Sequence, residues 1–246
     1  MNEWYHEAFR ALYMPIYAHR DAKEARQTVD LITRAVCLRP GQQVLDASCG
    51  AGRHAREFAR HGCAVYALDL SRDLLSEARK SSAEPAPCYL RADLRSIPFG
   101  PRRFDLVANL FSSFGYFQSD EKNYAVLAEF ARVCRPGGHV VLDFMNEPQV
   151  RDALRPETRR RAPGGWTVRE TRRITGEPPR IEKTGLAHSA SGVEIRWRES
   201  VRLFTPRELA DAMRRAGLEI TSTFGDYSGA PHTPASPRLI LAGKLI

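Results

Sequence analysis

The sequence predicts an α/β protein: a mostly parallel, doubly wound sheet of seven strands with helices on both faces, and a small inserted antiparallel sheet. Between Pro40 and Phe144, short apolar runs alternate with amphipathic helical stretches, which is the pattern of successive βαβ units. After Phe144 the pattern changes to strand-like alternation between turn residues, which is typical of antiparallel strands. A chain of 246 residues with 43% apolar content can bury one core, so we expect one domain with an insertion.

The first part of the chain supplies five strands and three helices. We expect the strands over residues 43–46, 64–69, 88–91, 104–109 and 139–144, and the helices over 53–61, 71–79 and 122–133. The segment Arg135-Pro-Gly-Gly138 ends the last of these helices, because proline cannot continue a helix and glycine reaches positive φ at little cost.

The second part begins with an arginine-rich stretch and three expected strands, over residues 166–174, 180–188 and 193–204. A helix over 206–216 follows, with Thr205 as its cap, Pro206 at its first position and Gly217 as its stop. Strands over 219–224 and 239–245 then complete the main sheet.

The N-terminal segment is expected to be helical up to Pro15, because Tyr5, Phe9 and Tyr13 recur at a spacing of four residues. An aromatic stripe packed on the core is the favoured interpretation. The alternative makes Tyr13 or Tyr17 part of a cap over a bound cofactor.

Composition excludes several classes of protein. No apolar run reaches 18 residues and the first residues do not resemble a signal peptide, so we expect a cytoplasmic protein without membrane contact. Five cysteines without a C-x-x-C pair and seven scattered histidines predict neither disulfides nor a metal site. The net charge of +8 favours acidic partners, but it does not by itself predict nucleic-acid binding, which we consider unlikely.

A glycine turn between the first strand and the first helix carries the most information. Gly50 and Gly52 allow close backbone approach to a ligand, and the first helix amides can donate to it. The pattern also satisfies the dinucleotide fingerprint, with Asp69 at the distance of a ribose-binding acid. Asp46 separates the alternatives, because a carboxylate near the turn is poorly matched to a pyrophosphate but well matched to the ammonium group of a methionine moiety.

The stretch Asp46-Ala-Ser-Cys-Gly-Ala-Gly52 resembles the first motif of the class I (Rossmann-like) S-adenosylmethionine (SAM)-dependent methyltransferases. The resemblance continues at Tyr66-Ala-Leu-Asp-Leu-Ser71, Arg91-Ala-Asp-Leu-Arg-Ser-Ile-Pro-Phe99, Phe104-Asp-Leu-Val-Ala-Asn-Leu-Phe111 and Arg135-Pro-Gly-Gly-His-Val-Val-Leu-Asp-Phe144. It extends to Phe204-Thr-Pro-Arg-Glu-Leu and Ala216-Gly-Leu-Glu-Ile220, and so covers most of the chain. It implies SAM as the cofactor and a Rossmann-like domain over 40–146 and 204–246. Together with the pattern of the remaining segments, this gives a helical cap over 1–39 and a lid, substrate or dimer region over 147–203.

The resemblance also implies a set of cofactor-binding residues. These are Asp46, Ala47, Gly50, Gly52, Arg53, Asp69, Leu70, Asp93, Leu94 and Asn109, with Tyr17 from the cap. Asp69 would accept from the ribose hydroxyls, Asp93 would lie beside the adenine amino group, and Arg53 or His54 would contact the cofactor carboxylate. Each has a simpler alternative as a helix cap, turn residue or surface residue.

Methyl transfer is an in-line displacement at an activated carbon, so alignment and exclusion of water are the main requirements. If a base assists, the candidates are Tyr116, His188, Glu199, Tyr227 and His232, although each has a structural alternative. The run Asn109-Leu-Phe-Ser-Ser-Phe-Gly-Tyr116 departs from the Pro-Pro-aromatic pattern of nucleobase amino-methyltransferases. It therefore disfavours adenine or cytosine as the acceptor.

The inserted sheet is the expected source of acceptor specificity. Arg196, Arg198 and Arg202 alternate along one strand, where they either bind an acidic group of the substrate or form a solvated or dimer-forming face. We expect a small-molecule acceptor, with an acidic acceptor and a homodimer as further hypotheses. The alternatives are an RNA or protein methyltransferase and a non-catalytic SAM- or nucleotide-binding protein.

Overall fold

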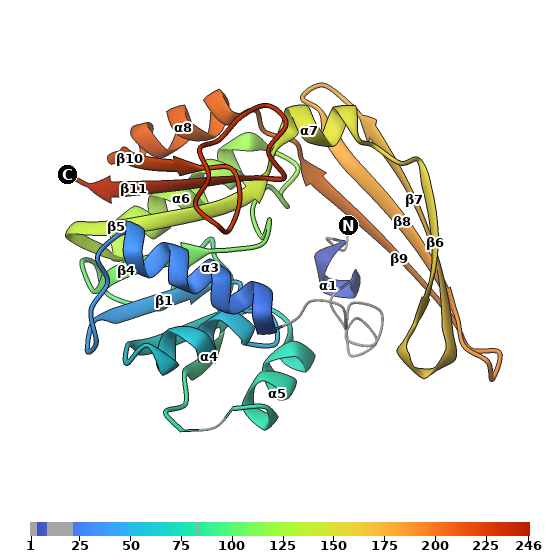
Figure 1. Cartoon of the computed structure of the whole chain (residues 1–246), viewed down its shortest axis with the longest axis horizontal. Helices are drawn as coiled ribbons and strands as arrows, with labels where there is room; N and C mark the ends of the chain where they lie inside the picture. The colour runs from blue at the N-terminus through green and yellow to red at the C-terminus, as the bar shows by residue number, and fades with distance from the viewer. Residues whose placement is uncertain (1–3, 9–21, 83) are drawn as a thin grey trace.

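The structure is a computed structural model that describes residues 4–8, 22–82 and 84–246. Its strands form two sheets, as Figure 1 shows. The main sheet has seven strands in the order β10-β11-β5-β4-β1-β2-β3, and the second has four in the order β6-β7-β8-β9. In the main sheet β11 runs antiparallel to β5 and β10, and the other neighbouring strands are parallel. The predicted fold class is therefore confirmed.

The strands of the main sheet are β1 (Gln43–Ala47), β2 (Ala64–Asp69), β3 (Cys88–Arg91), β4 (Phe104–Asn109), β5 (Cys134–Met145), β10 (Leu218–Phe224) and β11 (Arg238–Leu245). The second sheet consists of β6 (Glu157–Ala162), β7 (Trp166–Thr175), β8 (Arg180–His188) and β9 (Glu194–Arg202). The helices are α1 (Tyr5–Ala8), α3 (Ala22–Ala35), α4 (Arg53–Arg60), α5 (Arg72–Lys80), α6 (Asp120–Val133), α7 (Glu147–Asp152) and α8 (Pro206–Arg215), with a short 3₁₀ helix, η1 (Pro163–Gly165).

The core has two apolar layers, one on each face of the main sheet. Helices α3, α4 and α5 bury side chains such as Ile32, Phe58 and Leu75 against one face. Helices α6 and α8 cover the other face with residues such as Phe130 and Met213. Central strands covered on both faces are nearly continuous apolar runs, which is why these strands were predictable from the sequence.

The helix boundaries reflect local capping. Thr205 accepts a hydrogen bond from the Glu208 amide at 3.2 Å, and the Glu208 carboxylate accepts one from the Thr205 amide at 2.7 Å. This capping box confirms the predicted start of α8. Ser71 likewise accepts from the Leu74 amide at 3.2 Å and begins α5.

Strands β5 and β6 differ from the sequence prediction, and helix α7 and the 3₁₀ helix η1 were not predicted. Strand β5 begins at Cys134 rather than at residue 139, because Cys134 pairs with Phe104 before an irregularity in the ladder. Strand β6 was not predicted at all. It pairs only with β7 and reads Glu-Thr-Arg-Arg-Arg-Ala, so it lacks the apolar alternation of a covered strand.

The second sheet projects to one side of the main sheet, and the short helix α1 lies between the two sheets (Figure 1). Tyr5 in α1 is buried, and its ring lies 5.8 Å from that of Phe117. Phe9, Tyr13 and Tyr17 lie outside the described residues. No helix in the described ranges is both long enough and apolar enough to span a bilayer.

Candidate active site

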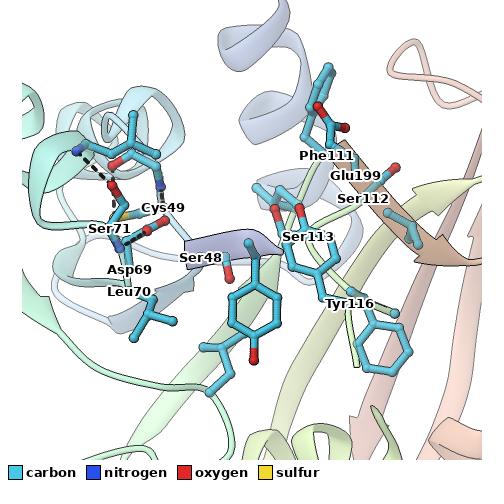
Figure 2. A pocket seen from close by; sticks show the side chains of 18 of the residues that line it. Ser48, Cys49, Asp69, Leu70, Ser71, Phe111, Ser112, Ser113, Tyr116 and Glu199 are labelled. Atoms are coloured by element: carbon cyan, nitrogen blue, oxygen red, sulfur yellow. Dashed lines mark hydrogen bonds between the residues drawn. The ribbon is translucent and has the colours of Figure 1, made fainter. Parts of the chain in front are cut away.

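A cavity of about 1000 Å³ opens at the carboxyl ends of β1, β2 and β4 and extends to the second sheet. Pockets for single small ligands have volumes of roughly 300–1000 Å³. Figure 2 shows Cys49, Asp69, Leu70 and Ser71 on one side of this cavity and Phe111, Ser112, Ser113, Tyr116 and Glu199 on the other. The cavity therefore has two ends, which we call the glycine-turn end and the second-sheet end.

The glycine-turn end is built by a carboxylate that fixes a backbone turn. Asp69, at the end of β2, accepts hydrogen bonds from the Gly50 amide at 2.7 Å and from the Ser71 amide at 2.8 Å. Burial raises the pKa of Asp69, and the backbone amides of Ser71, Gly50 and Leu70 oppose that rise. A Cβ atom added at Gly50 would meet no atom within 4 Å, so this residue borders open space. Asp69, Gly50 and Leu70 all line the cavity.

Asp46 lies beneath this turn rather than in the cavity wall. Its side chain is only 1% exposed, and its carboxylate accepts a hydrogen bond from the Ala55 amide in the first turn of α4. Burial, followed by the nearby Asp69 carboxylate, raises its pKa to about 7, while Arg53 acts in the opposite direction. Its Oδ2 atom has no hydrogen-bond partner among the described residues. A buried carboxylate oxygen without a partner is uncommon, because buried polar atoms usually form hydrogen bonds.

Three other predicted residues also lie outside the described cavity wall. Gly52 has φ of +76°, and an added Cβ would lie 2.5 Å from the Tyr89 hydroxyl, so glycine is required for packing. Ala47 is fully buried in β1. The Asn109 side chain donates to the Ala47 carbonyl at 2.9 Å and to the Ser113 carbonyl at 3.3 Å, which ties the end of β1 to the loop after β4.

Arg53 lines the cavity at the start of α4. Its Nη1 donates to Glu24 of α3 at 2.6 Å, and its guanidinium carbon lies 4.6 Å from the centre of the Phe111 ring. Its Nη2 is buried and has no hydrogen-bond partner among the described residues. The guanidinium is thus held from two sides, by Glu24 and by the Phe111 ring.

The loop after β3 contributes Asp93 and Leu94 to the same wall. The Asp93 carboxylate accepts from the Arg95 amide at 2.9 Å and from the Arg95 guanidinium at 2.6 Å. These contacts fix the carboxylate at the cavity edge.

A buried ion pair shapes the loop after β4, and sequence reasoning missed it. Asp143 of β5 is fully buried and accepts from Arg238 Nε at 2.8 Å, from the Phe111 amide at 2.9 Å and from the Tyr227 hydroxyl at 3.0 Å. Phe111 and Ser112 have φ of 56° and 61°, a left-handed conformation that costs energy in residues other than glycine. The Asp143 contacts hold this strained turn in the cavity wall.

Of the five candidate bases, Tyr116 and Glu199 line the cavity. Tyr227 is bound to Asp143, and burial followed by that carboxylate raises its pKa well above its ordinary value. His188 is half-exposed at the end of β8 and lies 3.6 Å from Glu194. His232 contacts the Asn146 side chain at 2.9 Å. These last three residues are not brought to the cavity wall that the structure describes.

The second-sheet end is not lined by the three arginines that the sequence suggested for one strand face. Arg196 and Arg198 are largely exposed and pair with Glu194 and Glu182, while Arg202 is buried against Glu208. The cavity instead receives the alternate residues Glu199 and Val201 from β9, with Lys183 and Ile181 from β8 and Arg172 from β7. Strand register decides which cations share a face, and neither Lys183 nor Arg172 stands out in the sequence.

Fold and cavity together define an α/β protein with a large cavity at the carboxyl ends of its parallel strands, which is where open α/β sheets bind their ligands. Residues 44–138 match the family model described as a methyltransferase domain. The chain is 30% identical over 218 residues to a dTDP-3-amino-3,4,6-trideoxy-alpha-D-glucopyranose N,N-dimethyltransferase of Streptomyces venezuelae, covering 85% of this chain and 87% of that protein.

Solved structures agree. The CcbJ methyltransferase of Streptomyces caelestis has the same fold, with a TM-score of 0.82 at 17% identity over 99% of this chain and 98% of the other. The SAM-bound amino pentose methyltransferase CalS10 of Micromonospora echinaspora has a TM-score of 0.72 at 25% identity over 96% and 97%. The chain belongs to the class I SAM-dependent methyltransferases and is an enzyme that uses SAM.

Proposed function

We propose that this enzyme transfers the methyl group of SAM to an amine nitrogen of a small-molecule acceptor bound in the same cavity. The observation that carries the proposal is the cavity of about 1000 Å³, whose glycine-turn end and second-sheet end give room for two ligands. The relative from Streptomyces venezuelae is named as an N,N-dimethyltransferase and CalS10 as an amino pentose methyltransferase. Both names support nitrogen on a small molecule as the acceptor.

The residues at the glycine-turn end fit SAM. Asp69 would accept from the ribose hydroxyls with the lone pairs that Gly50 and Ser71 leave unused. Asp93 and the Leu94 backbone would contact the adenine. The unpartnered Oδ2 of Asp46 and Nη2 of Arg53 offer opposite charges to the ammonium and carboxylate of the methionine moiety, with Asp46 acting from beneath the turn.

Bound SAM supplies a methyl group on a positively charged sulfur, so the protein itself has to hold the acceptor in line and exclude water. The aromatic wall made by Tyr5 and Tyr116, whose rings stack with centres 6.2 Å apart, suits that role. Glu199 is the carboxylate best placed to take a proton from an acceptor ammonium, since it lines the second-sheet end.

The proposal has four further parts, which concern the acceptor, the location, the domains and the oligomeric state. We propose an acidic acceptor, favoured by the net charge of +8. A cytoplasmic location is favoured because all five cysteines are free. We retain the division into a helical cap over 1–39, a Rossmann-like domain over 40–146 and 204–246, and a lid, substrate or dimer region over 147–203, because Tyr5 and the second sheet both border the cavity. Helix α3, at the end of the first segment, packs on the main sheet. A homodimer is the fourth part, and sedimentation velocity tests it.

Calorimetric titration with SAM, S-adenosylhomocysteine and NADH tests the cofactor assignment. We expect SAM and S-adenosylhomocysteine to bind, and we expect Asp69→Asn to weaken both affinities about tenfold. The asparagine side chain has one acceptor oxygen, so its two ends cannot accept from both the Gly50 and the Ser71 backbone N–H groups. Asp105→Asn is the matched control, since Asp105 binds Gln43 and Arg135 outside the cavity. Binding of NADH alone would overturn the proposal in favour of a dehydrogenase.

A further inference from the structure

Three charged side chains stand side by side on the cavity face of the second sheet. Arg172 of β7 lies directly opposite Lys183 of β8, and Lys183 lies directly opposite Glu199 of β9. All three line the same cavity as Gly50 and Asp69. Two cations facing each other across neighbouring strands repel, so the arrangement requires compensation.

A buried carboxylate beside the row provides part of that compensation. Glu170 is 4% exposed, and its Oε2 lies 2.6 Å from Arg172 Nη2 while its Oε1 lies 3.8 Å from Lys183 Nζ. Burial alone would raise the pKa of Glu170, but the charges of Lys183, Arg172 and Arg160 outweigh it and the pKa is lowered. Glu170 therefore stays ionised and holds the two cations from a neighbouring position on the same face of the sheet, because residues i and i+2 of a strand point to one face.

A second carboxylate completes the row, since Glu199 Oε2 lies 2.7 Å from Lys183 Nζ. Arg172 donates Nη1 to the Thr158 hydroxyl at 2.8 Å and Nη2 to Glu170. Those contacts use two of the five N–H donors of a guanidinium. Arg172 is 24% exposed and lines the cavity, so the remaining donors are available to a bound molecule.

We propose that Arg172 and Lys183 form an oxyanion subsite for the methyl acceptor, and that the acceptor therefore carries a carboxylate or phosphate group besides its nucleophile. The inference rests on the proposed function, since it assigns one end of the cavity to the acceptor. A planar guanidinium next to an ammonium is the donor set that binds such groups most strongly. The anion fixed at the second sheet holds the acceptor across the cavity from the glycine turn.

The competing explanation is an ionic ladder that only stabilises the sheet, and the opposite face supplies its control. Arg173 follows Arg172 in β7, is 72% exposed, lies 2.8 Å from Glu182 and does not line the cavity. Arg172→Gln and Arg173→Gln each remove one ion-paired arginine, and the two arginines are consecutive in one strand. Only Arg172→Gln removes a donor from the cavity.

The test is calorimetric titration of the full-length protein, saturated with S-adenosylhomocysteine, with inorganic pyrophosphate and separately with malonate. We expect at least one of these anions to bind wild type. Arg172→Gln should weaken the affinity for that anion at least tenfold, and Arg173→Gln should change the affinity less than twofold. Affinity for S-adenosylhomocysteine is expected to be equal in all three proteins. Pyrophosphate binding alone would assign the group as a phosphate, and malonate binding alone as a carboxylate.

No binding of either anion to the cofactor-saturated wild type, or equal losses in the two variants, would overturn the subsite. Failure of wild type to bind S-adenosylhomocysteine would instead overturn the proposed function, so the two failures are distinguishable.

Discussion

The raised pKa of Asp46 predicts a pH-dependent penalty on the folded state. Its pKa rises from 3.8 to about 7 through burial and then through Asp69. The folded protein therefore holds this proton more tightly than the unfolded chain. Stability is lost as the pH rises from about 4 to about 7, and the loss is complete above that range. At about 1.4 kcal/mol per unit, the full penalty is about 4 kcal/mol.

Asp46→Asn removes the ionisable group while keeping an oxygen that can accept from the Ala55 amide. Urea unfolding of both proteins between pH 5 and pH 8 measures the effect. We expect the free energy of unfolding of the variant, relative to that of wild type, to be about 3 kcal/mol higher at pH 8 than at pH 5, because this interval spans about two pH units of the titration.

Asp105→Asn is the control, because backbone and side-chain hydrogen bonds lower the pKa of Asp105 against the opposing effect of its burial. A lowered pKa gives stability that is fully present above about pH 4. The free energy of unfolding of Asp105→Asn should therefore differ from that of wild type by a constant amount between pH 5 and pH 8. A constant difference for Asp46→Asn as well would refute the reasoning.

Two predictions concern packing around the cavity. Gly52→Ala adds a Cβ 2.5 Å from the Tyr89 hydroxyl at φ of +76°, so we expect a loss of about 2 kcal/mol in urea unfolding. Gly41→Ala is the control, because Gly41 has φ of +84° and no atom within 4 Å, so this variant measures the cost of the positive φ alone. Equal losses of stability in the two variants would exclude a contribution from the contact with Tyr89. Asp143→Asn leaves Arg238 without its charged partner, so thermal and urea unfolding should show a loss of about 3 kcal/mol. An unchanged midpoint would show that this ion pair does not hold the loop.

Sequence predicted the main sheet well because its strands are covered on both faces and separated by helices with clear caps. It missed β6, where an edge strand of mostly charged residues gives no apolar signal. The glycine-turn end was also predictable, since Gly50, Asp69 and Asp93 follow strand ends at fixed spacing and lie in one wall.

The second-sheet end was not predictable in the same way. Arg172, Lys183 and Glu199 come from three strands, and only the pairing register brings them together. Arg238 reaches the loop after β4 from the last strand of the sheet. Such contacts between distant segments leave no local pattern in the sequence.

The most direct test of the central claim is transfer of a labelled methyl group from SAM to a panel of small amines with and without an acidic group, followed by mass spectrometry of the products. The account predicts label on the nitrogen of a small acceptor, with S-adenosylhomocysteine formed in equal amount. Label found only in added RNA or protein, or SAM binding without transfer to any amine, would contradict it.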